Sequence, residues 1–234
     1  MPPSSHDTSD TPSGRRLVVA VDGPSGSGKS SVSREVARRL GLRYLDTGAM
    51  YRALTWWAIE RGADLDDQPE VARLARELPV EIGTSTDSSM LTVDGHDVSA
   101  AIREPRISAA VSAVATNLGV RDELVRRQRE IAAAGGIVVE GRDITTVVAP
   151  DADIRVLLTA NEQARLARRA LEVHGSDDDD AIEATRDHVV GRDEQDSTVA
   201  DFLEAGEGVT VVDSSHLSFE ETVDAILDLV SARR

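Results

Sequence analysis

Residues 17–30 read Leu-Val-Val-Ala-Val-Asp-Gly-Pro-Ser-Gly-Ser-Gly-Lys-Ser, a short apolar run that gives way to a glycine-rich loop. The wholly apolar run Leu17–Val21 is typical of a strand buried on both faces of a parallel sheet. Gly23–Ser30 matches the pattern G-x-x-x-x-G-K-[ST], in which glycines let main-chain N–H groups converge on phosphate oxygens. Apolar residues then follow helical spacing from Gly28 to Leu40, so the loop leads into a helix N-terminus that favours anions. This order predicts a site for a nucleoside triphosphate.

The loop predicts roles for its own side chains. Lys29 would bridge the β- and γ-phosphates, and the Ser30 hydroxyl would help to hold Mg²⁺ as the cofactor. Lys29 is also the one lysine of the chain, because every other basic residue apart from histidine is an arginine. We expect ATP to be bound by Gly23, Pro24, Ser25, Gly26, Ser27, Gly28, Lys29, Ser30 and Ser31.

Short apolar runs and helical patterns alternate along the rest of the chain. Further buried strands are expected at 43–45, 137–139, 154–158 and 209–212, and helices at 49–61, 69–78, 105–116, 119–134 and after the capping box Ser218-x-x-Glu221. Residues 79–98 instead resemble two or three antiparallel strands with hairpin turns. These patterns predict a three-layer α/β fold with a five-stranded parallel sheet and a small antiparallel β insertion. We expect residues 1–14 to be a disordered leader and 15–234 to be one domain.

Composition excludes several classes of protein. The formal net charge is −16, which argues against a nucleic-acid binder or an anionic-membrane binder, since both need a basic face. The chain has no cysteine, so disulfides, thiolate catalysis and Cys-ligated metal sites are excluded. No apolar run approaches the ~20 residues that span a bilayer. We therefore expect a cytoplasmic monomer that binds small molecules.

A phosphate-binding loop is compatible with kinases, switch GTPases and ATP-driven motors. Switch GTPases read guanine with an Asn-Lys-x-Asp element, which this chain cannot contain because its one lysine is in the loop. No assembly signal of a motor is visible, so a small-molecule kinase is the leading class. Such a kinase needs arginines that neutralise the transferring phosphoryl group and a second anion site. The candidates are Arg52, Arg103, Arg121, Arg142, Arg165, Arg169 and Arg192.

Five segments together resemble the bacterial cytidylate kinases, which belong to the P-loop nucleoside monophosphate kinases. They are Val21–Ser30, Tyr44–Arg52, Val98–Arg103, Val120-Arg121 and Glu140-Gly-Arg-Asp143. The resemblance implies a kinase domain with a monophosphate-binding insertion at about 79–104 and a helical lid at about 165–185. It also implies transfer of the γ-phosphoryl group of ATP to CMP or dCMP, with Mg²⁺, in pyrimidine nucleotide metabolism.

The resemblance further implies which residues bind and react. The cytosine pocket would be lined by Thr47, Ser112, Arg121 and Asp143. The acceptor's 5′-phosphate would be held by Arg52, Arg142 and Arg192, and its ribose by Asp196. The transferring phosphoryl group would be neutralised by Lys29, Arg142, Arg165, Arg169 and Arg192. Asp22 and Asp46 end strands beside the loop, where an outer-sphere role toward Mg²⁺ is one reading and, for Asp22, a structural hydrogen-bond acceptor is the other.

The chain departs from the family pattern at two positions near these motifs. After Arg192-Asp-x-x-Asp-Ser-Thr the family continues with an arginine, where this chain has Val199. Thr145 stands where the family commonly has glycine. Two alternatives stay open: a kinase for another nucleoside monophosphate, and an ATP-binding paralogue with impaired turnover, which the missing arginine suggests.

Overall fold

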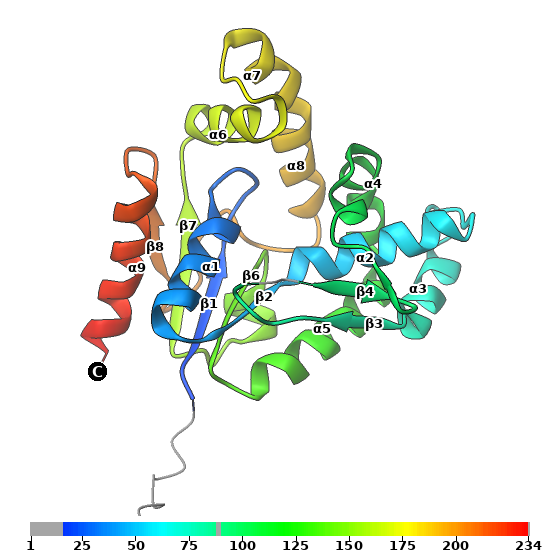
Figure 1. The fold of residues 1–234 in the computed structure, drawn as a ribbon, viewed down its shortest axis with the longest axis horizontal. Coiled ribbons are helices and arrows are strands. Elements are labelled where there is room, and N and C mark those ends of the chain that lie inside the picture. The colour runs from blue at the N-terminus through cyan, green and yellow to red at the C-terminus, as the bar shows by residue number, and fades with distance from the viewer. Residues whose placement is uncertain (1–15, 88–89, 234) are drawn as a thin grey trace, which may run out of the picture.

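A five-stranded parallel sheet forms the centre of the molecule (Figure 1). The structure is a computed structural model that describes residues 16–87 and 90–233. In the order of the sheet, the strands are β2 (Arg43–Asp46), β6 (Ile137–Gly141), β1 (Val18–Asp22), β7 (Ile154–Thr159) and β8 (Thr210–Asp213). The predicted fold class is therefore confirmed, while the predicted leader at residues 1–14 lies outside the described residues.

Helices cover both faces of the sheet. Alternate side chains of a strand point to opposite faces, and every residue of β1 is buried, so neither face is open to solvent there. Val19 and Val21 pack with apolar residues of α1 (Lys29–Leu40) and α9 (Phe219–Ala232). Val18 and Ala20 belong to a second apolar cluster on the other face. That cluster draws on α2 (Thr47–Glu60), α3 (Gln68–Glu77), α4 (Pro105–Ala115) and α5 (Leu118–Ala133). The result is the expected three-layer arrangement.

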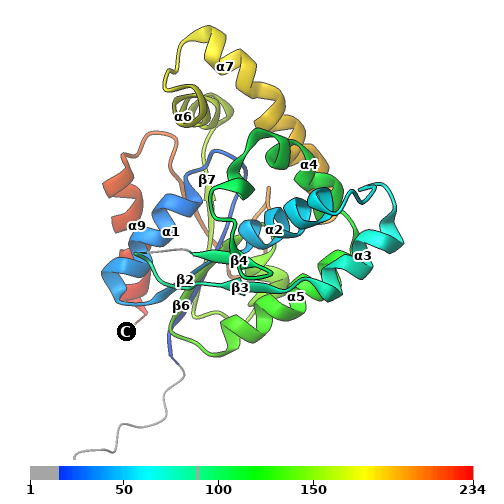
Figure 2. The same cartoon turned by 45° about the vertical axis from the view of Figure 1, so that its right-hand side comes forward.

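A second, small sheet is antiparallel and lies beside α2 and α3 (Figure 2). Its strands are β3 (Val80–Ile82), β4 (Leu91–Val93) and β5 (His96–Asp97). Asp94 and Gly95 turn the chain between β4 and β5 with φ of 51° and 76°, the left-handed backbone of a tight hairpin. Leu91 and Val93 are buried in the same apolar cluster as Val18 and Ala20 of β1, and this packing holds the small sheet against the main one.

Three helices stand over the end of the sheet where the glycine-rich loop lies (Figure 1). They are α6 (Glu162–His174), α7 (Asp179–Arg186) and α8 (Arg192–Asp196), and a π-helical turn at Asp187–Gly191 joins the last two. A second π-helical turn, Ile144–Val148, follows β6, and a 3₁₀ turn, Ala101–Arg103, precedes α4. Across the described parts of the chain, no helix combines the length and apolarity that crossing a membrane requires.

Candidate active site

The glycine-rich loop joins β1 to α1 and packs closely against α6. Gly26 and Gly28 have φ of +75° and +86°, a left-handed backbone that favours glycine. A Cβ atom at Gly26 would lie 2.5 Å from the backbone oxygen of Arg165, whereas a Cβ at Gly28 would meet nothing within 4 Å. Glycine at position 26 is therefore required twice, by the backbone and by the neighbouring helix.

Lys29 and Ser30 begin α1 and face the end of β6. The Nζ atom of Lys29 donates to the backbone oxygen of Pro24 at 3.4 Å. Burial, and next the positive charge of Arg142, lowers the pKa of Lys29 to about 8, although the residue as a whole is only half-buried. The Ser30 hydroxyl donates to Oε1 of Glu140 at 2.7 Å. The Lys29 ammonium group therefore lies near both positive and negative side chains, and a bound anion would stabilise its charged form.

Two carboxylates at the strand ends have opposite pKa shifts. Asp46 accepts the backbone N–H of Ala49 at 2.9 Å, which caps α2, and pairs with Arg52 at 2.8 Å. Although burial acts against ionisation, Arg52 and that N–H hold the pKa of Asp46 below its ordinary value. Burial and then the charge of Asp46 raise the pKa of Glu140. A cation beside Glu140 would therefore stabilise its ionised form.

Arg142 contacts both the loop and α8. It donates to the backbone oxygen of Gly23 at 2.9 Å and to the Ser25 hydroxyl at 2.8 Å. Its Nε atom donates to Asp196 at 3.2 Å, and its guanidinium stacks over Phe202 at 4.2 Å from the ring centre. The residue predicted to bind phosphate is thus fixed at the loop by contacts on three sides.

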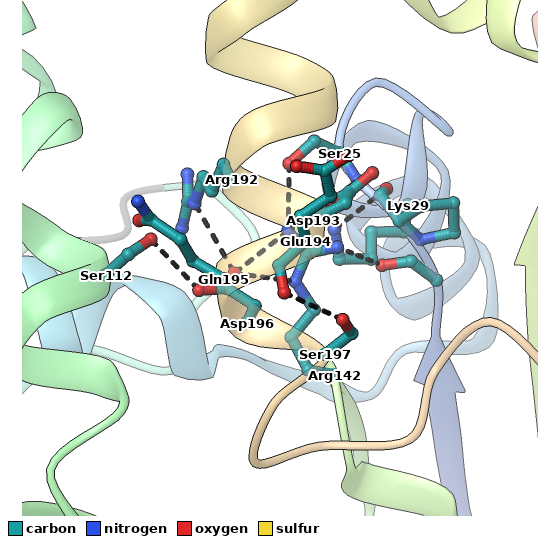
Figure 3. Close-up of polar contacts among 12 residues, drawn as sticks. Ser25, Lys29, Ser112, Arg142, Arg192, Asp193, Glu194, Gln195, Asp196 and Ser197 are labelled. Carbon is teal, nitrogen blue, oxygen red and sulfur yellow. Dashed lines mark hydrogen bonds and ion pairs between the residues drawn. The ribbon is translucent and has the colours of Figure 1, made fainter.

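Helix α8 completes the site, with Asp193 facing the glycine-rich loop and Asp196 facing α4 (Figure 3). Asp196 accepts the Ser112 hydroxyl of α4 at 3.0 Å and lies 3.6 Å from Nε of Arg192. That Nε is buried and has no hydrogen-bond partner among the described residues. Burial and the charge of Arg142 lower the pKa of Arg192 to about 10. An anion in front of Arg192 would relieve both conditions.

Of the four residues predicted to recognise the base, Arg121 and Asp143 are in direct contact, whereas Ser112 bonds to Asp196 of α8. Arg121 of α5 donates to Oδ2 of Asp143, and the two side chains are only 14% and 8% exposed. Thr47 donates to the backbone oxygen of Glu140 at 2.8 Å. A nearly buried guanidinium–carboxylate pair presents donors and acceptors side by side, which suits the edge of a heterocyclic base.

The two arginines predicted for the lid have different partners. Arg165 donates to the backbone oxygen of Ser25 at 3.0 Å and to Asp193, so it already reaches the loop. Arg169 donates to Glu172 on its own helix at 2.8 Å. Its charge still contributes to the lowered pKa of Arg192. Of these two arginines, Arg165 contacts the loop and Arg169 does not, and the roles expected for both stay predictions.

The family model for cytidylate kinase matches residues 19–232, nearly the whole chain. The chain belongs to the cytidylate kinase family. A cytidylate kinase from Cutibacterium acnes is 52% identical over 216 residues, which are 92% of this chain and 96% of that relative. The cytidylate kinases of Nocardia farcinica and Streptomyces griseus are 48% and 45% identical and cover 95% and 93% of this chain, and 95% and 94% of their own lengths. The resemblance inferred from the sequence motifs is confirmed.

One departure from the cytidylate kinase pattern has a structural partner. Asp22 accepts the backbone N–H groups of Ile144 and Thr145 at 2.7 and 2.8 Å, and the Thr145 hydroxyl at 2.6 Å. Asp22 is 2% exposed, and both oxygens of its buried carboxylate accept these bonds. This favours the structural reading of Asp22 over a role toward a metal. Thr145 contributes two of the three bonds, and the one made by its hydroxyl would be absent with the glycine common in the family.

Sequence reasoning assigned no role to three side chains that contact the loop. Asp193 accepts the backbone N–H of Ser25 at 2.9 Å, Glu140 accepts the Ser30 hydroxyl, and Arg168 donates to the backbone oxygen of Ser27 at 3.4 Å and to Ser214 at 2.9 Å. Glu140 lies inside a segment that carries the cytidylate kinase resemblance, and Asp193 lies inside the family pattern that begins at Arg192. A charged residue next to a functional arginine was the available signal. The spacing alone did not show which way each side chain points.

Proposed function

We propose that this chain carries out the reaction of its family, transferring the γ-phosphoryl group of ATP to CMP or dCMP. One observation supports it above the rest: Arg142 and Arg192 converge with the phosphate loop at α8, and one of them holds the loop directly. With Arg165, three guanidinium groups face two carboxylates in this part of the described chain, Asp193 and Asp196. Excess positive charge in a partly buried site favours polyphosphate ligands.

The donor ATP would lie over Gly23–Ser31, with its β- and γ-phosphates beside Lys29. Mg²⁺ is the metal that fits there, because Ser30 and Glu140 offer oxygen donors, the type this ion prefers. Within residues 16–87 and 90–233, no three or more His, Cys, Asp or Glu side chains group to hold a metal. Ser30 and Glu140 would therefore share the ion with nucleotide phosphates and water. When bound, the ion would neutralise charge on those phosphates.

The acceptor would lie between α4, α5 and α8. Arg121 and Asp143, with Thr47 and Ser112, would bind the cytosine, whose edge offers a carbonyl acceptor and an amine donor. Its ribose would lie against Asp196. The 5′-phosphate would be held by Arg52, Arg142 and Arg192, whose planar forks suit phosphate oxygens.

Phosphoryl transfer in this site needs positioning and charge neutralisation rather than a general base. The acceptor phosphate oxygen is already anionic, so no proton has to be removed before it attacks the γ-phosphorus. Lys29, Arg142 and Arg165 would neutralise the charge that develops on the transferring group. We propose that the lid at about 165–185 excludes water, and that the insertion at about 79–104 helps to bind the monophosphate.

A coupled assay that follows ADP formation tests the function. With ATP and Mg²⁺, CMP and dCMP should turn over roughly a hundredfold faster than AMP, GMP or shikimate. Equal rates would contradict the base assignment. ATP binding without ADP formation under any monophosphate would support the paralogue with impaired turnover. Size-exclusion chromatography would test the expected monomer. We propose a cytoplasmic location, with which the lack of cysteine is compatible.

A further inference from the structure

Asp193 is a buried carboxylate of α8 to which neither the sequence motifs nor the proposed chemistry assigns a role. It is 5% exposed. Its neighbours in sequence are Arg192, proposed to bind phosphate, and Glu194, which is exposed. Figure 3 shows it on the side of α8 that faces the phosphate loop, whereas Asp196, one turn later, faces α4. A buried carboxylate is costly unless it is paired, so its partners indicate its function.

Asp193 contacts three elements at once. Its Oδ1 accepts the backbone N–H of Ser25 at 2.9 Å and lies 2.9 Å from a guanidinium nitrogen of Arg142. Its Oδ2 accepts from Arg165 of α6. The same Arg165 nitrogen donates to the backbone oxygen of Ser25 at 3.0 Å. One carboxylate therefore links the loop, the end of β6, and the first turns of α6.

The two arginines reach the loop from different elements, Arg142 from the end of β6 and Arg165 from α6, and the carboxylate of Asp193 contacts both. Arg142 is also held by Gly23 and by the Ser25 hydroxyl. Among the described residues, the hydrogen-bond partners of Arg165 are Asp193 and the backbone oxygen of Ser25. Long arginine side chains lose considerable rotamer freedom when they are fixed, so a fixed anion that pre-orders them reduces the cost of reaching the reactive arrangement. Arg165 depends most on this anion.

We infer that Asp193 is a positioning residue that orients Arg165, and with it Arg142, toward the transferring phosphoryl group before substrate binds. The inference rests on the proposed function. Asp193 contacts no reacting atom in this account and acts through the arginines. Its effect should therefore fall on kcat, because correct orientation matters most in the transition state. Ground-state attraction for ATP should persist, since the variant Asp193→Asn keeps an acceptor for the Ser25 N–H and removes a negative charge near the loop.

A double-mutant cycle tests this coupling in the full chain. Asp193→Asn should lower kcat by roughly 10- to 100-fold, the scale of a misplaced catalytic group, and leave KM for ATP within about threefold. Arg165→Met should lower kcat to a similar extent. The kcat of the double variant should then lie within about threefold of that of Arg165→Met, because the carboxylate has lost the arginine that depends most on it. Glu194→Gln removes the same charge from the exposed side of the same helix and should leave both constants unchanged.

Two outcomes would overturn the inference. If the two effects on kcat multiply, Asp193 does not act through Arg165. If Asp193→Asn raises KM while kcat stays at the wild-type value, the residue supports substrate binding or the fold only. Should Asp193→Asn fail to fold, the cycle is run with Asp193→Glu, which keeps the charge but displaces it by one methylene, and the same non-additivity is required. Wild-type turnover of CMP is measured alongside, so a failure of the proposed function is recognised separately.

Discussion

Replacing Lys29 with methionine should destroy activity and make the nucleotide-free protein more stable. Burial beside Arg142 lowers the pKa of Lys29 from 10.5 to about 8. Each pKa unit corresponds to about 1.4 kcal/mol, so the charged form costs the folded state at most about 3.5 kcal/mol, less where solvent still reaches the half-buried residue. Methionine keeps much of the volume without the charge. Loss of the phosphate bridge should cost about 3–4 kcal/mol of transition-state stabilisation, or roughly 10²- to 10³-fold in kcat.

Urea unfolding without nucleotide measures the stability, and the coupled assay measures the activity. The sign can also be checked by pH. The unfolded chain binds the Lys29 proton up to about pH 10.5, whereas the folded chain releases it near pH 8, so wild-type stability should rise with pH between these values. Lys29→Met should lack that rise. A variant that is less stable than the wild type at pH 7, or that keeps more than about a tenth of the wild-type kcat, would refute the reasoning.

Three further predictions concern the same site. Because Lys29 must be charged to bind phosphates and its pKa is about 8, kcat/KM for ATP should fall as pH rises through about 8; a profile flat to pH 10 would contradict this. Arg121→Ala should lower kcat/KM for CMP relative to AMP by roughly 10- to 100-fold, the worth of a charged hydrogen bond, whereas the exposed, ion-paired Arg126→Ala should leave the ratio unchanged. Gly28→Ala should cost about 1 kcal/mol in urea unfolding, and Gly26→Ala distinctly more because its Cβ meets the α6 backbone; equal losses would remove the steric argument.

The order of the parallel strands and of most helices could be predicted because each of these has a local signal, whereas α6, α7 and α8 were expected only as part of a helical lid. Leu17–Val21 is apolar on both faces, and the loop and helix that follow have their own residue requirements. The hairpin at Asp94-Gly95 and the capping box at Ser218 were equally local, and both are present. Several boundaries differ by one or two residues from those expected; α2, for example, begins at Thr47 rather than 49, because the side chain of Asp46 caps it.

The candidate site could be predicted only as far as the motifs name its residues. The pairing of Arg121 with Asp143 joins residues 22 positions apart on different elements, and that of Ser25 with Asp193 spans 168 positions. Hydrophobic periodicity gives no signal for such contacts, because it reports which face is buried and not which polar groups meet. Arg165 and Arg169 lie one helical turn apart, so the pattern places them on one face of the helix, but it does not show that Arg165 bonds to Ser25 and Arg169 to Glu172.

The contact between Gly26 and α6 limits how the proposed lid at about 165–185 could move. The backbone of Arg165 rests where a side chain at position 26 would be, so the first turn of α6 has no room to advance further toward the loop. In the proposed lid, we therefore expect the end next to the loop to stay in place and any movement to pivot beyond Arg165. Arg169 and α7 lie beyond that expected pivot. One arginine would thus stay with the donor nucleotide through each cycle, while the other would arrive with every closure.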